Sequence, residues 1–427
     1  MKSHTLASTA LPTDIRFSAG ERLFRRLLSK ALAGFKEGQL ILIDALGEQR
    51  FGTASDDCPL TVRVVVDDAE FYRLAVTRGH IGAAEAYMAG HWRCDHLTDL
   101  VRLFVRNRHA MNAMESGLAR LAQPLFRLYH WSRRNTRTNS RANIEAHYDL
   151  GNDFYRLFLD ETMMYSCAVY PRPESDLVTA SRHKLERICR KLDLKPDDHL
   201  LEIGTGWGEL AIHAASHYGC RVTTTTISKE QYRLARERVA RAGLTDRITV
   251  LCDDYRDLTG QYDKLVSVEM IEAVGHQYLD SYVQTCSRLL KPQGMMLLQS
   301  ITIMDQHYEA AKTWGDFIQR YIFPGGFLPS VAALSDAVAR VSDMRIFHLE
   351  DIGPHYARTL RDWRERFLAN LDGVRALGFS ESFIRMWEFY LCYCEGGFLE
   401  RNIGTVQLLL VKPRNRREPI LPALEGI

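Results

Sequence analysis

The sequence lacks any long hydrophobic run. No stretch of about 18 apolar residues occurs among its 427 residues, so we expect no segment that spans a bilayer. Residues Met1–Ala10 contain a single lysine and no sustained apolar core, so we expect no secretory signal. Any contact with a membrane is therefore expected to be peripheral.

Cysteine is sparse and follows no pattern. The nine cysteines include no C-x-x-C pair, which excludes a disulfide scaffold and predicts reduced, mostly buried thiols in a cytosolic protein. Apolar residues make up 46% of the chain and charged residues 25%, as in ordinary globular proteins. The length predicts two or three domains, and no internal repeat is evident.

The net charge is only +2, but it is unevenly distributed. Residues 1–142 contain 21 Lys/Arg and 14 Asp/Glu, whereas the remaining residues contain 34 and 39. A basic module therefore precedes an acidic one.

Two segments account for the basic excess. In Ala19–Lys36, apolar residues recur at helical spacing and basic residues occupy the other faces. Ser116–Ile144 contains no acidic residue, six arginines and three aromatic residues. An Arg-rich segment with aromatic side chains suits an anionic lipid surface. The alternative for each segment is a solvated helix that packs its apolar face on the core.

The second half of the sequence alternates strand and helix signals. Strands are predicted at His199–Ile203, Arg221–Ile227, Ile248–Cys252, Lys264–Val268, Met295–Ile301 and Thr405–Val411. Helices are predicted at Glu209–Tyr218, Lys229–Ala242 and Tyr278–Leu290. This alternation predicts a mostly parallel sheet that is covered by helices on both faces.

A glycine-rich loop is the strongest local signal. In LLEIGTGWGEL (residues 200–210), a buried strand runs into Gly204, Gly206 and Gly208, and a helix follows. Glycine lets a ligand approach the backbone where a Cβ would collide, and open α/β sheets bind ligands at the carboxyl ends of their strands. The G-x-G-x-G spacing, with Glu202 before it, resembles motif I of S-adenosylmethionine (SAM) methyltransferases. The alternative is a glycine-rich structural turn.

Polar residues after the next two strands are candidates to hold the same cofactor. Most such enzymes place an acid after the second strand to bind the ribose hydroxyls, whereas this sequence has Thr226 and Gln231, which can hydrogen-bond a diol without charge. Asp254 and Tyr255 follow the third strand, where the adenine would lie, although an aspartate there is more often a helix cap.

Six motifs occur in order along the chain: AHYDLGNDFYRLFLDETMMYSCAVY (146–170), LEIGTGWG (201–208), SVEMIEAVGH (267–276), YIFPGGFLPS (321–330), DIGPHYARTL (351–360) and FYLCYCEGGF (389–398). With these motifs the sequence resembles the bacterial cyclopropane-fatty-acyl-phospholipid synthases. The resemblance includes the N-terminal module, through VRVVVDDAEFYRLAV (62–76) and GAAEAYMAGHWRCD (82–95), so it covers nearly the whole chain.

The resemblance implies a fold and a domain organisation. The fold is α/β, with a class I SAM-methyltransferase (Rossmann-like) catalytic domain at residues 143–427. The stretch NTRTNSR (135–141) is polar and lacks apolar periodicity, so it predicts a linker at residues 135–142. A smaller, mainly helical, lipid- or membrane-associated domain is expected at residues 1–134.

The implied reaction adds the SAM methyl group to a cis double bond of a phospholipid acyl chain, and loss of a proton from the added methyl closes a cyclopropane ring. The expected partners are unsaturated membrane phospholipids at the inner, cytoplasmic face of the membrane. No nucleic acid is expected, and a homodimer is expected by analogy.

The resemblance also implies the residues of the site. Bicarbonate is the implied base, held by the backbone of Cys167 and Ile301 and by the side chains of Glu272, Gln299 and Tyr356. For each residue taken singly, an ordinary surface or core role is the alternative.

The resemblance implies further site residues whose role in the reaction is less defined. Tyr165 and Ser166 are implied to lie at the cofactor, and the rings of Tyr165, Phe317 and Tyr321 are candidates to stabilise a carbocation, with core packing as the alternative. Cys394 matches a cysteine of the family's active site and is interpreted as a pocket residue, not a nucleophile. A C-x-C pair is a weak metal signal, and no metal is expected.

Gln299 departs from the pattern, because the related synthases have histidine in the motif L-L-H-T-I and this sequence reads LLQSI (297–301). Glutamine can hydrogen-bond bicarbonate but cannot titrate near neutral pH. Ring closure with geometric support alone stays open, as does proton loss from a neighbouring chain carbon, which leaves a methyl-branched alkene. A non-catalytic lipid-binding protein is the alternative of another class, although the intact glycine loop argues against it.

Overall fold

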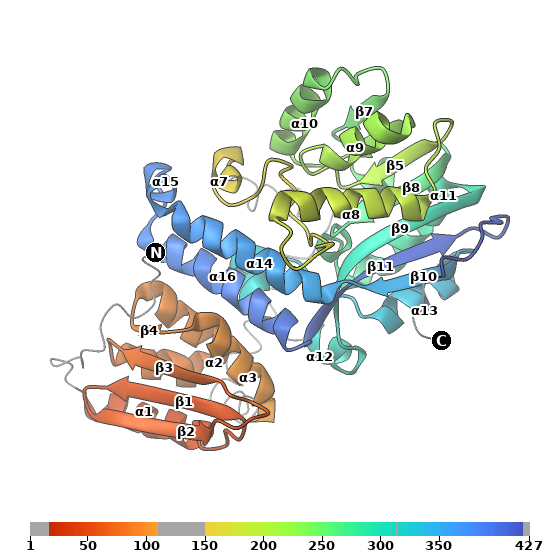
Figure 1. The fold of residues 1–427 in the computed structure, drawn as a ribbon. Coiled ribbons are helices and arrows are strands. Elements are labelled where there is room, and N and C mark those ends of the chain that lie inside the picture. Colours follow the sequence, from red (N-terminus) through yellow and green to blue (C-terminus); the bar gives the residue numbers. More distant parts are fainter. Residues whose placement is uncertain (1–16, 110–149, 313–314, 422–427) are drawn as a thin grey trace. The chain divides into compact units, whose positions relative to one another are not determined.

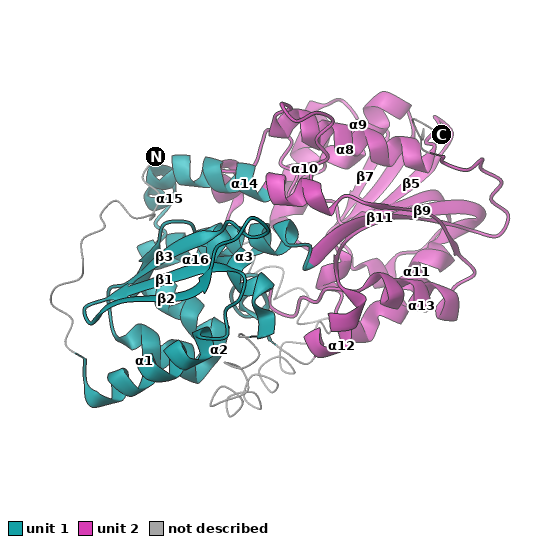
Figure 2. Ribbon diagram, turned by 60° about the horizontal axis from the view of Figure 1, so that its bottom comes forward, with its two compact units in different colours: residues 1–132, 313–322, 360–402 teal, residues 133–312, 323–359, 403–427 magenta. Residues whose placement is uncertain are grey.

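The computed structural model describes residues 17–109, 150–312 and 315–421, and the chain divides into two compact units (Figures 1 and 2). Unit 1 comprises residues 1–132, 313–322 and 360–402, and unit 2 comprises residues 133–312, 323–359 and 403–427. The units do not follow a single cut in the sequence, since residues 360–402 pack with the N-terminal segment. The predicted linker 135–142 and the basic segment Ser116–Ile144 lie outside the described residues, and the predicted domain limits stay a prediction.

Unit 2 is built on a seven-stranded sheet with the order β10-β11-β9-β8-β5-β6-β7 (Figure 1). The five strands β7, β6, β5, β8 and β9 are parallel to their neighbours. β11 pairs antiparallel with β9, and β10 pairs antiparallel with β11. The strands are β5 (His199–Ile203), β6 (Arg221–Thr225), β7 (Ile248–Leu251), β8 (Tyr262–Val268), β9 (Leu290–Ile303), β10 (Arg345–Asp351) and β11 (Ile403–Val411). The six predicted strands are confirmed. β10 was not predicted, because its mostly exposed or half-buried residues mix charged and apolar side chains.

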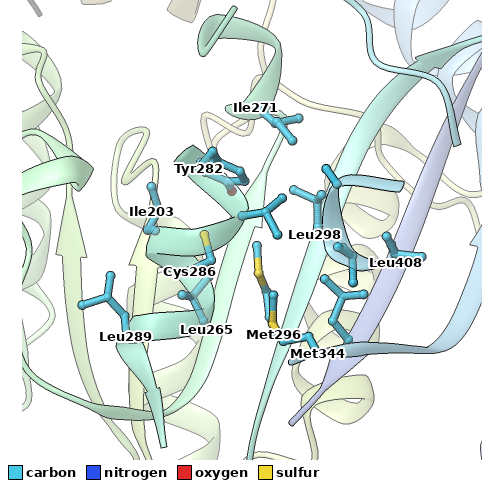
Figure 3. Packing of buried hydrophobic residues seen from close by; sticks show 14 of the residues in the cluster. Ile203, Leu265, Ile271, Tyr282, Cys286, Leu289, Met296, Leu298, Met344 and Leu408 are labelled. Carbon is cyan, nitrogen blue, oxygen red and sulfur yellow. The ribbon is translucent and has the colours of Figure 1, made fainter. Parts of the chain in front are cut away.

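The helices of unit 2 confirm the predicted alternation. They are α7 (Asn152–Arg156), α8 (Leu177–Leu192), α9 (Glu209–Tyr218), α10 (Lys229–Arg241), α11 (Leu279–Leu289), α12 (Tyr308–Ala311) and α13 (Val331–Val341), and α14 (Gly353–Ala369) begins in this unit. α11 and α13 contribute to one apolar core with Leu265 and Leu298 of the sheet. Figure 3 shows part of this core, including Tyr282 and Cys286 of α11. α8 and α9 contribute to a second core with Val266 and Leu297. Successive strand residues thus enter different cores, as the two-residue period of a strand requires.

Unit 1 contains a four-stranded sheet with the order β2-β1-β3-β4. Its strands are β1 (Gly38–Asp44), β2 (Gly47–Thr53), β3 (Thr61–Val66) and β4 (Trp92–Cys94), and its helices are α1 (Ala19–Leu32), α2 (Glu70–Ala89), α3 (Leu97–Arg106), α15 (Leu371–Ala376) and α16 (Glu381–Leu399). Helices are longer in total than strands in this unit, in agreement with the expected mainly helical domain, but its sheet was not predicted. β2 is a largely polar edge strand and β4 has only three residues, so neither carries a clear apolar pattern. β1 and β3 do carry one, but the sequence analysis assigned no strands there.

All nine cysteines lie within the described residues as free thiols, and seven are buried, which confirms the prediction of unpaired, mostly buried cysteines. Among the described residues, no helix combines the length and the apolar character that crossing a bilayer requires.

Candidate active site

The glycine-rich loop joins β5 to α9 at the switch point of the sheet, where the chain runs outward through β6 and β7 and returns on the other side as β8. Gly204 and Gly206 have φ values of 106° and 52°, which L side chains rarely adopt. A Cβ on Gly204 would lie 3.3 Å from the Cβ of Met270, whereas one on Gly206 would have no atom within 4 Å. The backbone at Gly206 is open to a ligand, so the loop fits the SAM cofactor that the sequence predicts.

Polar side chains beside this loop are paired within the protein. Glu202 is buried and accepts a 2.6 Å hydrogen bond from Thr224 Oγ1. Burial raises the pKa of Glu202 to about 8, and the Thr224 hydroxyl opposes that rise. Thr226 Oγ1 donates to Gln231 Oε1 over 2.8 Å, and both residues are buried. The predicted pair is therefore brought together, and its role toward a cofactor stays a prediction.

Asp254 and Tyr255 make contacts that favour the structural alternative. Asp254 caps the short 3₁₀ helix that begins at Tyr255, and its carboxylate also accepts hydrogen bonds from the guanidinium of Arg256. The Tyr255 ring packs edge-on against Tyr282, with 5.4 Å between ring centroids. Helix capping and core packing account for these contacts, and the cofactor role of both residues stays a prediction.

Glu269 lies at the centre of a polar cluster. It follows β8 directly and has a φ of 49°, an unusual backbone conformation for a residue with a Cβ. Its Oε1 accepts hydrogen bonds from the Cys167 backbone N–H (3.0 Å) and from Gln299 Nε2 (2.8 Å). Its Oε2 accepts a 2.7 Å hydrogen bond from the Tyr356 hydroxyl. Burial raises the pKa of Glu269, while the three donors stabilise the ionised form and oppose that rise.

Glu272 lies one 3₁₀ turn farther along the chain. Its Oε1 accepts hydrogen bonds from Ser300 Oγ (3.0 Å) and from the Ile301 backbone N–H (2.5 Å). Its Oε2 is buried and has no hydrogen-bond partner among the described residues. Burial, followed by the nearby charge of Glu269, raises the pKa of Glu272 to about 8. This rise in pKa favours the neutral form of Glu272.

Bicarbonate does not fit this arrangement. The Cys167 amide, the Gln299 side chain and the Tyr356 hydroxyl, which the resemblance assigns to bicarbonate, all donate to the Glu269 carboxylate instead. The other two members of the implied set, the Glu272 carboxyl and the Ile301 amide, bond to each other. The predicted residues are thus brought together, but around a carboxylate of the protein itself.

Sequence reasoning missed Glu269. The residue stands in SVEMIEAVGH three positions before Glu272, and the resemblance pointed to Glu272 alone. A signal was available, because an acid that directly follows a buried parallel strand lies at the ligand-binding edge of the sheet. Val268, the last residue of that strand, pairs with Gln299, so the acid and the departure from the family pattern lie on adjacent strands.

Tyr165 and Ser166 lie beside the backbone donor to Glu269. Ser166 Oγ accepts a 2.6 Å hydrogen bond from the Nζ of Lys184, a buried lysine of α8. Burial lowers the pKa of Lys184 to about 8. The Tyr165 ring packs against Tyr155 and Phe323, with ring centroids 5.3 Å and 6.5 Å away. Roles of Tyr165 and Ser166 in cofactor binding stay predictions.

Phe317, Tyr321 and Cys394 belong to unit 1. The Phe317 ring lies 4.8 Å from that of Phe389, and the Tyr321 hydroxyl donates to Glu85 over 2.6 Å. Burial raises the pKa of the Cys394 thiol, which argues against a nucleophilic thiolate. Packing and pairing within unit 1 account for the contacts of these residues, and a role at the site stays a prediction.

Comparison with known proteins identifies the family. A family model described as mycolic acid cyclopropane synthetase matches residues 135–408. The chain belongs to the mycolic acid cyclopropane synthetase family. Within it, the chain is 42% identical to tuberculostearic acid methyltransferase of Mycobacterium tuberculosis, over 78% of this chain and 79% of the relative. It is 37% identical to cyclopropane-fatty-acyl-phospholipid synthase of Escherichia coli K12, over 82% of this chain and 87% of the relative.

Solved structures of the family agree. Mycolic acid cyclopropane synthase CmaA1, complexed with SAH and CTAB, superposes with a TM-score of 0.60 at 32% identity, covering 64% of this chain and 98% of that one. Coclaurine N-methyltransferase, at 19% identity and a TM-score of 0.59 over 77% of this chain and 98% of that one, shares the fold. The resemblance and the class I methyltransferase fold are confirmed, and the protein is a SAM-dependent methyltransferase that modifies lipids.

Proposed function

We propose that the protein methylates a cis double bond in the acyl chain of a membrane phospholipid, with Glu269 as the base. The observation that carries this proposal is the Glu269 carboxylate held by the three donors that the resemblance assigns to bicarbonate. Bound SAM supplies an electrophilic methyl group on a sulfonium. The alkene π electrons form the new C–C bond as the S–CH₃ bond breaks, and its electron pair stays on sulfur.

Glu269 has the chemistry that the second step needs. The carbocation left on the acyl chain must lose one proton, and a carboxylate can accept it. Donors on both oxygens hold Glu269 in one orientation, so the position of the accepting atom is set before substrate binds. Gln299 cannot take up a proton near neutrality, so among the described residues of this cluster the carboxyl groups that can are Glu269 and Glu272.

We propose a methyl-branched product that keeps a double bond. Two points support it: the 42% identical relative is a methyltransferase by name, and Gln299 stands where the related synthases have histidine. Cyclopropane is the second candidate, as the sequence analysis first expected, and the 37% identical synthase supports it. The two outcomes differ in which carbon loses the proton.

The test incubates the protein with SAM and vesicles of monounsaturated phospholipid, then treats the released acyl chains with hydrogen under mild conditions. Both products gain the same CH₂, so mass alone does not separate them. We expect a product that takes up hydrogen. A product that resists hydrogenation would establish ring closure, and no SAM-dependent change in the acyl chains would overturn both candidates.

We further propose that α1 contacts the headgroups of an anionic lipid surface. Leu23 and Leu27 lie one turn apart and are 54% and 40% exposed. Arg22, Arg26 and Lys30 follow the same four-residue spacing on the adjacent stripe, and all three are exposed. Exposed leucines beside basic side chains suit the boundary between headgroups and acyl chains.

Reversing the three basic charges of this stripe (R22E, R26E and K30E together) is expected to weaken binding to vesicles that contain anionic lipid. Raising the salt concentration is expected to weaken wild-type binding as well, because surface attraction is screened within about 10 Å at 0.1 M. Vesicle co-sedimentation measures both effects.

A matched control reverses three exposed arginines of α10: Arg233, Arg236 and Arg241. It makes the same change in net charge, so a non-specific charge effect would weaken binding equally in both variants. That result, or wild-type binding that is indifferent to salt and to anionic lipid, would contradict the proposed role of α1.

A further inference from the structure

A chain of buried hydrogen bonds leads away from Glu269 on the side of Gln299. Gln299 lies on β9 directly opposite Gln407 of β11 in the antiparallel register. Gln407 Nε2 donates to Gln299 Oε1 over 2.9 Å, and Lys191 Nζ of α8 donates to Gln407 Oε1 over 2.7 Å. Both glutamines are fully buried, and Lys191 is 7% exposed. At its outer end Lys191 pairs with Glu350, which is partly exposed.

We infer that Lys191 and Gln407 are positioning residues that fix the direction of the Gln299 amide, so that Gln299 donates to Glu269. This inference rests on the proposed role of Glu269 as base. Neither positioning residue is bonded to Glu269 directly in the contacts described, and both act through Gln299.

The orientation of each amide depends on which of its neighbours can donate a hydrogen bond. A lysine ammonium has donors only, so the Gln407 carbonyl must face Lys191 and its NH₂ must face Gln299. The Gln299 carbonyl then faces Gln407, and its NH₂ is left for Glu269 Oε1 and, more weakly, for the Cys167 carbonyl at 3.4 Å. Each amide is oriented by the one before it. At the other end, the ionised Glu269 carboxylate and the Cys167 carbonyl accept only and favour the same orientation, so the lysine is the end group whose effect does not depend on the ionisation of Glu269.

The direction of the Gln299 amide matters because its two ends have opposite effects on a carboxylate. An N–H donor stabilises ionised Glu269, whereas a carbonyl turned toward it would repel the charge. Amides do not titrate, so this series of hydrogen bonds affects the pKa of Glu269 but does not transfer protons. The other groups that face Glu269 are Tyr356 of α14, the Cys167 segment, Lys184 of α8 and Glu272.

The test is Gln407→Glu, which keeps the shape and the acceptor for Lys191 but removes the donor to Gln299. The Gln299 NH₂ is then drawn to residue 407, and its carbonyl turns toward Glu269. The carbonyl raises the pKa of Glu269, which must be ionised to accept a proton. We therefore expect the acidic limb of the plot of kcat/KM against pH to move to higher pH by about one unit. Lys191→Met is expected to move it in the same direction by less.

A double variant distinguishes an effect that acts through Gln299 from a general disturbance of the fold. In a Gln299→Leu background, the pH shift caused by Gln407→Glu is expected to fall to less than half, whereas an equal shift in both backgrounds would overturn the inference. Thr405→Val is the matched control on the same strand, because the Thr405 hydroxyl is buried with no partner among the described residues. Thr405→Val is expected to leave the profile unchanged, and an equal shift in this control would also overturn the inference.

The outcomes also distinguish this inference from the proposed function. If Glu269→Gln retains full turnover, Glu269 is not the base, whatever residue 407 does. If Glu269→Gln is inactive while Gln407→Glu folds with a wild-type melting temperature and an unmoved acidic limb, only the positioning role is overturned.

Discussion

Replacing Glu269 by glutamine is expected to reduce product formation by at least about 10²-fold, the usual contribution of a positioned acid or base. The variant keeps the shape of the side chain and one acceptor oxygen, but it cannot accept the proton that the carbocation must lose. Product formation is measured as methyl transfer from labelled SAM to phospholipid vesicles.

Asp263→Asn is a matched control for this variant. Asp263 lies on the same strand, β8, near the end opposite Glu269, and its carboxylate pairs with Lys291 over 2.7 Å. We expect that control to keep its turnover, and we expect both variants to bind SAM as the wild type does. Turnover in Glu269→Gln that equals the control would show that another group takes the proton.

Replacing Gly206 by alanine is expected to lower the affinity for SAM by about ten- to a hundredfold, which corresponds to roughly 1.4–2.8 kcal/mol. No protein atom lies within 4 Å of the added Cβ, so we expect the methyl group to displace bound SAM and not protein. The backbone at φ 52° adds a strain of about 1 kcal/mol, which affects the melting temperature. Calorimetric titration with SAM measures the affinity.

Gly243→Ala isolates the effect of that strain. Gly243 also has a positive φ, 70°, and a Cβ there would also have no atom within 4 Å, but the residue follows α10 and is not in the loop after β5. We expect a similar loss of melting temperature and an unchanged affinity for SAM. Equal SAM affinities in the two variants would mean that the loop at Gly206 does not face the cofactor.

The sequence predicted the parts of the fold that depend on short segments. The six strands and three helices of unit 2 were predicted because each has its own periodicity, with turn residues between them. The helix cap at Asp254 was also weighed, since a cap involves only the next few residues. In unit 1, the polar pattern of β2 does not reveal a strand or its partner, whereas the apolar β1 and β3 carry a strand pattern that was not assigned.

In the candidate site, too, some features were predictable from short segments and others depended on the tertiary structure. From the sequence alone, the glycine-rich loop after β5 and the family motifs determined that this is a SAM-dependent methyltransferase fold, because a strand, a turn and a helix start are local features. Only the tertiary structure decided that Glu269 receives the donors of Cys167, Gln299 and Tyr356. These residues are far apart in the sequence, and strand register and side-chain direction bring them within hydrogen-bonding distance. Those are properties of the packed sheet, which no single segment of the chain contains.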